Sequence, residues 1–415
     1  MTGSGQFFDD LETRSTDQRE VDLFTGLAGQ IANAKKNSVY FDNLLGYSSV
    51  GSVIDRATLA KISVTRKSDL QALQNKDPPF GGLVARQPGT LKRIFQSPGP
   101  IYEPEGFGED WWRMARALYA AGIRRGDIVH NAFAYHLTPA GSMVETGAGK
   151  IGCAVVPAGV GNTEQQLAAI AAIGAVAYAG TPSFLKILLE KADEFGVNVS
   201  SLKKATVGGE ALPPSLRQEI ETHGVSCLQL YASADLGCIA YESSAREGLI
   251  IEEKLIVEIV RPGTNDPVAE GEVGEVVVTT LCPEYPLIRF GTGDLSAMLS
   301  GTSPCGRTNM RIKGWMGRAD QTTKVKGMFV HPPQIAEVLK RHPEVSRARL
   351  IVDQKDGSDV MTLYCEVSDC GGERLEHGIA ASLQTVCKLK GVVKFAAPES
   401  LANDGKVIDD IRTYE

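Results

Sequence analysis

The chain has 415 residues, of which 43% are hydrophobic and 22% charged, and its formal net charge is −7. This length exceeds what one hydrophobic core usually serves, so we expect two domains. The negative charge argues against nucleic acid as the main partner. The acidic start, "MTGSGQFFDDLETR", lacks the apolar stretch of a signal peptide, and no apolar run is long enough to cross a bilayer. We therefore expect a cytoplasmic protein that does not bind a membrane.

The first half of the chain alternates between helix and strand patterns. One helix face is predicted near the N-terminus by the spacing of Val21, Leu23, Phe24, Leu27 and Ile31. From about residue 127, short apolar strands alternate with helices. Thr163 is expected to cap one of these helices, and Pro182 and Gly196 to bracket the next. Such repeated units predict an α/β fold with a mainly parallel sheet that is covered by helices.

Beyond about residue 236 the pattern changes. "KLIVEIVRPG", "GEVGEVVVTTL" and "YPLIRFGTGDLSAML" read as strands joined by turns, which predicts a β-rich subdomain at about 237–317. A polar break near 318–322 is followed by helix and strand patterns typical of a small α+β unit. We therefore expect a large N-terminal domain over residues 1–317 and a small C-terminal domain over 318–415.

Cysteine and histidine give no sign of a metal centre or a disulfide framework. The eight cysteines lie far apart without a C-x-x-C pair, and the six histidines follow no metal-binding spacing. Reduced thiols are the prediction for a cytoplasmic protein.

Two predicted strands end in segments suited to binding a ligand, because open parallel sheets bind ligands at the carboxyl ends of their strands. "VGGEALPP" (207–214) places Gly208, Gly209 and Glu210 after one strand, and "QLYASADLG" (229–237) places Tyr231 and Asp235 after the next. Tyr231 offers a surface for a flat ring, and Asp235 offers an oxygen ligand for Mg²⁺. Taken alone, each segment is more often an ordinary turn or a helix cap.

Two later segments carry further polar side chains. In "RFGTGDLSAM" (289–298), Asp294 lies in a glycine turn after a strand, where a carboxylate can accept hydrogen bonds from two ribose hydroxyls; the alternative is an ordinary turn aspartate. In "GRADQTTKVKGMFVHPPQIAEVL" (317–339), Arg318, Lys324 and Lys326 lie at the expected domain boundary and could meet phosphates; the alternative is a solvated linker.

Taken together and in order, these segments resemble the AMP-forming acyl- and aryl-CoA ligases, in particular their phenylacetate–CoA ligase branch. "KKNSVYFDNLL", "TRKSDLQ" with "DPPFGG", "AYHLTPAG" with "GNTEQQ", "YASAD", "LIRFGTGDL" and "GRADQTTKVKGMFVHPPQIAEVL" each match a motif of that branch. The resemblance covers nearly the whole chain. It implies that an acid is activated by Mg·ATP as an acyl-adenylate, that a mobile C-terminal domain then swings, and that coenzyme A takes up the acyl group.

The resemblance also implies roles for particular residues. Asp294 would hold the ribose hydroxyls with help from Arg318, and Asp235 would replace a family glutamate as the Mg²⁺ ligand. Asp320 would be the hinge between the domains. Lys406 would meet the carboxylate of the acid and the α-phosphate of ATP. The remaining ATP/AMP-binding positions would be Ser97, Gly99, Gly208, Gly209, Glu210, Tyr231, Ala232 and Ser233. The acid pocket would be formed by Phe133, Tyr135, His136 and Ala232, with Tyr135 next to the reacting carboxylate.

One segment departs from the family. Where its members carry Ser-Ser-Gly-Thr-Thr-Gly-Lys, this chain has "SPGPIYE", residues 97–103. Two threonines, a glycine and the lysine are missing, and Glu103 introduces a negative charge near the expected phosphates. A carboxylate about 4–5 Å from a phosphate is repelled by several kcal/mol at low dielectric unless a metal intervenes. Pro98 and Pro100 predict a rigid loop rather than a mobile flap.

Three functions stay open from the sequence. The first is a working acyl- or aryl-CoA ligase with a divergent loop. The second is an adenylate-forming enzyme with another acceptor, such as an amine or a carrier protein. The third is a homologue that binds a nucleotide or an acyl-CoA without ligase activity. The sequence leaves open which acid is used and whether the protein forms a homodimer.

Overall fold

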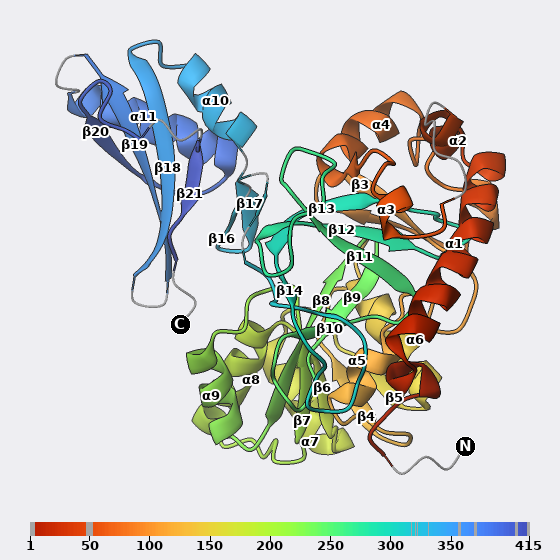
Figure 1. The fold of residues 1–415 in the computed structure, drawn as a ribbon. Helices are drawn as coiled ribbons and strands as arrows, with labels where there is room; N and C mark the ends of the chain where they lie inside the picture. Colours follow the sequence, from red (N-terminus) through yellow and green to blue (C-terminus); the bar gives the residue numbers. More distant parts are fainter. Residues whose placement is uncertain are drawn as a thin grey trace. The chain divides into compact units, whose positions relative to one another are not determined.

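The computed structural model describes residues 5–46, 53–316, 318, 319, 321, 323–330, 332–355, 358–368, 372–402 and 406–412. The chain divides into two compact units, Met1–Met316 and Gly317–Glu415 (Figure 1). Among the described helices, none combines the length and the apolar character that a membrane crossing requires.

A nine-stranded sheet forms one layer of the first unit. Five neighbouring strands, β5, β4, β6, β7 and β8, run parallel, and antiparallel strands extend the sheet beyond β8. In spatial order the strands are β14 (Met298–Leu299), β15 (Arg311–Ile312), β10 (Leu249–Ile251), β9 (Gly237–Tyr241), β8 (Ser226–Ser233), β7 (Lys204–Val207), β6 (Ala177–Gly180), β4 (Ile128–Asn131) and β5 (Ala154–Pro157).

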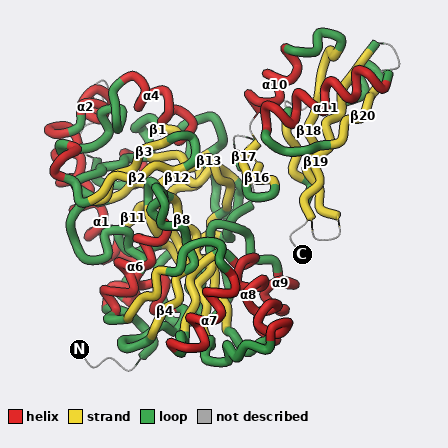
Figure 2. The backbone as a smooth tube through the Cα atoms, turned by 180° about the vertical axis from the view of Figure 1, so that it is seen from behind, coloured by secondary structure: helices red, strands yellow, loops and turns green. Residues whose placement is uncertain are grey.

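Helices cover both faces of the parallel strands (Figures 1 and 2). Ala177 and Ala179 of β6 pack in the cluster that contains α5 (Ala115–Ala120) and α6 (Ala140–Ile151). Tyr178, between them, packs in the opposite cluster with α7 (Thr163–Ile173), α8 (Pro182–Phe195) and α9 (Pro214–Thr222). This alternation follows from the two-residue period of a strand. The predicted parallel sheet covered by helices is confirmed.

A four-stranded sheet in the same unit has the order β1 (Thr65–Arg66), β13 (Phe290–Ser296), β12 (Gly274–Thr280) and β11 (Leu255–Val260). The segment predicted as one β-rich subdomain therefore divides between two sheets, because β9, β10, β14 and β15 join the larger one. Before β13 come α2 (Val39–Gly46), α3 (Arg56–Leu59), α4 (Leu70–Lys76) and a hairpin of β2 (Arg93–Ser97) and β3 (Ile101–Glu105), with short 3₁₀ turns at Asp10–Thr13, Lys67–Asp69 and Pro88–Thr90.

Most of the predicted face of the first long helix, α1 (Thr16–Asn37), is confirmed, because Leu23, Phe24 and Leu27 are buried and Ile31 packs against the same core. Val21 is exposed, whereas Arg19 and Gln30 are buried beside Leu23 and Leu27. The apolar pattern missed these two polar residues because their partners lie far along the chain. Gln30 donates through Nε2 to the carbonyl oxygens of residues 280 and 282, at 3.2 and 2.6 Å.

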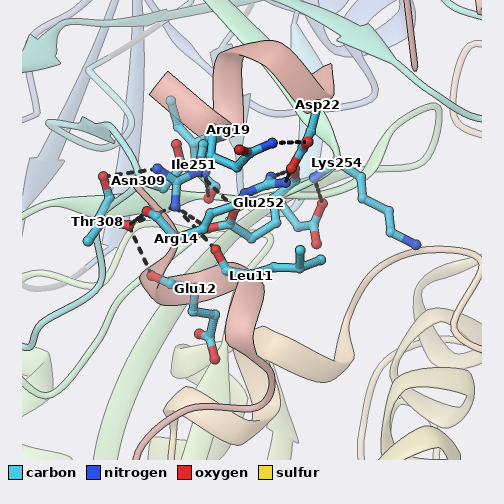
Figure 3. Close-up of polar contacts among 12 residues, drawn as sticks. Leu11, Glu12, Arg14, Arg19, Asp22, Ile251, Glu252, Lys254, Thr308 and Asn309 are labelled. Atoms are coloured by element: carbon cyan, nitrogen blue, oxygen red, sulfur yellow. Dashed lines mark hydrogen bonds and ion pairs between the residues drawn. The ribbon is translucent and has the colours of Figure 1, made fainter. Parts of the chain in front are cut away.

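A largely buried charge network ties Arg14 and Arg19 to Glu253, which follows β10, and to Thr308, which precedes β15 (Figure 3). Arg19 Nε lies 2.9 Å from Glu253 Oε2, and its Nη2 donates to Thr308 Oγ1 at 2.8 Å. Arg14 bridges Asp22 at 2.6 Å and Glu253 at 3.0 Å. Since both carboxylate oxygens of Glu253 are engaged by arginines, its buried charge is compensated.

Helix ends agree with the sequence at α8 and differ at α7. Pro182 is the first residue of α8, and Gly196 caps its end with a left-handed φ of 65°, as predicted. At α7 the N-cap is Asn162, in a left-handed conformation and without a side-chain hydrogen bond, so the prediction of Thr163 as the cap was wrong by one residue. Thr163 is instead the first helical residue.

The second unit, described by itself, is a small α+β fold. Its sheet has the order β20 (Val392–Ala396), β19 (Ser358–Val367), β18 (Val345–Lys355) and β21 (Ile408–Asp410). Two helices, α10 (Pro332–Lys340) and α11 (Glu373–Cys387), and a small hairpin of β16 (Thr323–Val325) and β17 (Met328–Val330) complete it. The Asp-Gly turn predicted between β18 and β19 lies outside the described residues.

We expect the substitution Arg19→Met to lower the free energy of unfolding of the first unit by about 3–5 kcal/mol, because it leaves the buried Glu253 short of a partner. The control is Arg261→Met, which removes an exposed 3.7 Å pair with Glu272 and should change stability by less than about 1 kcal/mol. Urea unfolding followed by tryptophan fluorescence measures both, since all three tryptophans, Trp111, Trp112 and Trp315, lie in this unit. Equal losses in the two variants would contradict the prediction.

Candidate active site

The nine-stranded and the four-stranded sheets of the first unit bring distant motifs together at the carboxyl end of β8. The Tyr231 hydroxyl donates to Asp294 Oδ2 at 2.8 Å, across 63 positions of sequence. The same hydroxyl lies 3.2 Å from Thr292 Oγ1. A bulge between Tyr231 and Ala232 interrupts the pairing of β8 with β9 at this point. Irregular pairing next to a strand end is common where a side chain is re-aimed toward a site.

The carboxylate of Asp294 is held by two donors. Besides Tyr231, the indole Nε1 of Trp315 donates to its Oδ1 at 3.1 Å. These two bonds orient both carboxylate oxygens of Asp294. Sequence reasoning missed Trp315, which lies outside every quoted motif, and gave no role to Thr292, which lies within "RFGTGDLSAM".

An ion pair lies beside the same strand end. Lys67 Nζ lies 2.6 Å from Asp235 Oδ2, and the Asp235 side chain is fully buried while about a quarter of the lysine, 26%, is exposed. Burial lowers the pKa of Lys67, but the charges of Asp235, Glu103 and Asp294 outweigh it and raise the pKa overall. Lys67 therefore keeps its positive charge close to the carboxyl groups of Asp235, Asp294 and Glu103. The sequence contained it only as part of "TRKSDLQ", a motif without an assigned role.

The other oxygen of Asp235 fits a metal ligand. Asp235 Oδ1 and the Tyr285 hydroxyl are buried and have no hydrogen-bond partner. Among the described residues, no group of three or more histidine, cysteine, aspartate or glutamate side chains could hold a metal. Asp235 Oδ1 could therefore hold a Mg²⁺ ion that comes with a nucleotide, because one or two carboxylates commonly suffice for such an ion.

The divergent segment forms a β-hairpin rather than an open loop. β2 and β3 pair from Arg93 opposite Glu105 to Ser97 opposite Ile101. Glu103, fully buried on β3, accepts hydrogen bonds from the backbone N–H of Ser97 at 3.2 Å and from the Ser97 hydroxyl. The carboxyl group and Ser97 therefore close the hairpin turn on itself.

The buried position of Glu103 changes its charge. Burial, followed by the nearby charge of Asp235, raises its pKa to about 8, although the bonds from Ser97 and the charge of Lys67 act in the opposite direction. At neutral pH most of the Glu103 population is then protonated. The negative charge expected from the sequence is therefore weakened by burial, and with it the repulsion of a phosphate.

The expected acid-pocket residues follow β4. The Tyr135 hydroxyl accepts a hydrogen bond from Asn131 Nδ2 at 2.7 Å, and a Cβ on Gly141 would come within 2.7 Å of the Tyr135 ring. Glycine at 141 thus leaves room for the ring. Burial and the charge of Glu145 raise the pKa of Tyr135, so its phenol stays neutral. Phe133 and His136 are part of the same segment.

The glycine turn after β7 has the backbone shape that a close approach requires. Gly209 has a φ of 77°, which favours glycine, and a Cβ on Gly208 would lie 3.0 Å from the Leu230 side chain. Glu210 accepts from the Ser183 hydroxyl at 2.6 Å. Ser233 accepts from the backbone N–H of residue 236, so its side chain closes the turn that leads to Asp235.

Residues predicted in the C-terminal domain belong to the second unit. Lys406 is half-exposed and lies 2.9 Å from Asp409. Arg318 is partly buried, and Asp320, the predicted hinge, lies outside the described residues. The structure thus brings together Tyr231, Asp235, Asp294 and the hairpin, whereas the roles predicted for Lys406, Arg318 and Asp320 stay predictions.

No protein-family model matches the chain, but several known proteins are similar to it over most of its length. The chain is 33% identical over 327 residues to the phenylacetate-coenzyme A ligase of Thermus thermophilus, which covers 75% of this chain and 72% of the relative. It is 29% identical over 387 residues to the phenylacetate-coenzyme A ligase of Aromatoleum evansii, which covers 86% of each.

Solved structures agree on the architecture. A crystal structure of 2-hydroxyisobutyryl-CoA ligase in complex with 2-HIB-AMP and CoA matches with a TM-score of 0.81 and 22% identity, covering 100% of this chain and 94% of that one. At this identity the match speaks for the fold alone, and it confirms the predicted α/β class.

We compare the melting temperature of Glu103→Gln with that of the unchanged protein. We expect the difference, variant minus unchanged protein, to increase as the pH is raised from 5 to 9. The folded-state pKa of about 8 lies above the ordinary value of 4.5, so the folded chain holds a proton that the unfolded chain releases. Stability therefore falls as pH rises through this window, and glutamine removes that loss. Scanning calorimetry without Mg²⁺ or nucleotide measures it.

The matched control is Glu105→Gln on the same strand. Glu105 is paired with Lys92 at 2.9 Å and Arg93 at 3.3 Å, so this change should lower the melting temperature. A difference between Glu103→Gln and the unchanged protein that stays constant from pH 5 to pH 9 would refute the raised pKa.

Proposed function

The chain belongs to the phenylacetate–CoA ligase family, and from this membership we infer that it is an AMP-forming ligase that activates an aromatic or related carboxylic acid and transfers it to coenzyme A. The observation that carries the proposal within the molecule is the contact of Tyr231 with Asp294 at the end of β8. This contact joins the two motifs that the family resemblance assigns to the adenosine of ATP.

The reaction has two steps. An acid carboxylate oxygen attacks the α-phosphorus of ATP, a new P–O bond forms, and pyrophosphate leaves. The sulfur of coenzyme A then attacks the acyl carbon of the acyl-adenylate, and AMP leaves. Catalysis of this kind rests on positioning and on compensation of phosphate charge, because the chain itself forms no covalent intermediate.

Residues of the β8 end would hold the nucleoside. Asp294, fixed by Tyr231 and Trp315, would accept the ribose hydroxyls, and the Gly208–Gly209 backbone with Glu210 would line the base beside Tyr231. Arg318 would assist at the ribose. Ser97, Gly99, Ala232 and Ser233 complete the proposed set. The support is that both carboxylate oxygens of Asp294 are already oriented by donors.

Charge at the phosphates would come from Lys67 and from Mg²⁺ at Asp235. When bound, Mg²⁺ supplies charge compensation for the phosphate oxygens. The support is the orphaned, buried Asp235 Oδ1 together with the Lys67 ammonium at the other oxygen. Aspartate is one methylene shorter than the family's glutamate, so a water can complete the contact.

The acid would lie in a pocket formed by Phe133, Tyr135, His136 and Ala232. Lys406 would meet the carboxylate of the acid and the α-phosphate of ATP during the first step. Asp320 would be the hinge of a moving second unit. The choice of an aromatic acid rests on the relatives' names and on this aromatic segment. The homodimer and the cytoplasmic location stay predictions.

The first test is exchange of labelled pyrophosphate into ATP with Mg²⁺ and a panel of aromatic and aliphatic acids. We expect exchange with at least one arylacetic acid and none without acid. Thioester formation with coenzyme A, compared with hydroxamate formation in hydroxylamine, then separates a CoA ligase from an enzyme with another acceptor. Protein that binds AMP but exchanges with no acid would overturn the proposal.

A second test is Asp294→Asn. The amide keeps the shape but replaces one acceptor oxygen with a donor and removes the charge, and hydrogen bonds to charged groups contribute about 1.5–3 kcal/mol. We expect the AMP dissociation constant from calorimetry to rise about tenfold or more. The exposed Asp266→Asn serves as control and should leave it unchanged. Unchanged AMP binding by Asp294→Asn would remove Asp294 from the site.

A further inference from the structure

The outer edge of the hairpin is bound by a helix instead of a third strand. Gln74 of α4 donates through Nε2 to the Tyr102 carbonyl oxygen at 2.8 Å and accepts through Oε1 from the Tyr102 N–H, also at 2.8 Å. Only 4% of Gln74 is exposed. Gln71, one turn earlier, donates to the Gly99 carbonyl oxygen at 2.7 Å.

The Gln74 amide reproduces what a peptide group does in a sheet. A peptide of a neighbouring strand would offer one N–H and one C=O to the edge, and the side-chain amide offers the same pair to Tyr102. A side chain at position 74 that cannot bond would leave the N–H and C=O of Tyr102 without this partner. The register between α4 and β3 is therefore fixed at this one residue.

The opposite edge of the hairpin is also fixed. The backbone N–H of Gln96 on β2 donates to the Leu137 carbonyl oxygen at 2.8 Å, in the segment that carries Tyr135 and His136. The Gln96 side chain also donates to the Tyr102 hydroxyl at 3.1 Å. The hairpin thus lies between α4 on one side and the proposed acid-pocket segment on the other.

Gln74 also shares a structural element with the site lysine. The 3₁₀ turn Lys67–Asp69 leads directly into α4, so Lys67 and Gln74 are fixed on one continuous helical segment. Lys67 interacts electrostatically with Glu103, which closes the hairpin onto Ser97. The bonds from Gln74 to Tyr102, next to Glu103, therefore set the spacing between Lys67 and the hairpin.

We propose that Gln74 is a positioning residue for the phosphates of ATP, because its side-chain amide holds the hairpin in register over Lys67 and Asp235. This inference rests on the proposed function, which places the nucleotide phosphates at the hairpin. Gln74 does not touch the nucleotide itself. It acts through Tyr102, Glu103 and Ser97.

The test is Gln74→Met, which keeps the length of the side chain and removes both bonds. We expect the KM for ATP, and the dissociation constant of a non-hydrolysable ATP analogue measured by calorimetry, to rise about tenfold. The KM values for the acid and coenzyme A should change less than twofold. Hydrogen exchange should show faster exchange of the Tyr102 amide. Gln74→Glu retains the acceptor and should give an intermediate dissociation constant.

The matched control is Gln30→Met. Gln30 is likewise buried, at 5% exposure, and donates to the backbone carbonyls of residues 280 and 282; within the described part of the chain it makes no hydrogen bond to the hairpin. It should lose stability to a similar degree without a change in ATP-analogue binding. A general loss of stability therefore cannot account for weaker binding by Gln74→Met alone.

Two results overturn the inference. One is ATP-analogue binding by Gln74→Met within twofold of the unchanged protein; the other is an equal loss of binding in Gln30→Met. If Gln74→Met does not fold, Gln71→Ala replaces it as the test, because this change removes only the exposed bond to Gly99. We expect the dissociation constant of the ATP analogue to rise two- to threefold. Unchanged binding by Gln71→Ala would then overturn the inference. Failure of the proposed function is distinct, because the unchanged protein would then show no pyrophosphate exchange.

Discussion

Two carboxyl groups, those of Asp235 and Glu103, are buried within electrostatic reach of each other and of a single lysine. Burying two like charges is unfavourable unless one group is protonated or a cation neutralises them. The chain does both, since Glu103 is largely protonated at neutral pH and Lys67 is bonded to Asp235. The parallel pairing of the short strand β1 with β13 brings Lys67 to this place, and the hairpin brings Glu103.

This arrangement gives the divergent phosphate segment a physical role. The serine of the segment is engaged by Glu103 through both its N–H and its hydroxyl. Donors that a family member would direct at phosphates are thus directed at the hairpin itself. A preformed hairpin loses less conformational entropy than a mobile loop when a nucleotide binds. The smaller entropy loss favours tighter binding. Lys67, on the helical segment that also carries Gln74, places a positive charge beside this hairpin.

The sequence predicted those features that depend on local pattern or on a motif. The parallel sheet, the helix α8 with Pro182 and Gly196 at its ends, and the meeting of Tyr231 with Asp294 followed from periodicity, capping chemistry and motif order. Features that depend on a distant partner were not predictable. Arg19 and Gln30 interrupt the apolar face of α1, and only the folded chain shows which acceptors satisfy them. The raised pKa of Glu103 likewise depends on its burial on β3 and on the charge of Asp235, more than a hundred positions later in the chain.

The same reasoning explains why the charge of the segment misled the sequence interpretation. A carboxylate in an exposed loop would keep its charge and repel phosphate, whereas a carboxyl group on an inward-facing strand position meets a low dielectric and holds its proton. Whether residue 103 faces inward is decided by the hairpin register, in which Glu103 lies opposite the buried Phe95. That register is in turn fixed from outside, by the amide of Gln74 on Tyr102 and by Leu137 on Gln96. The electrostatics of the proposed phosphate site therefore depend on backbone pairing, and a residue that never meets the nucleotide can control them.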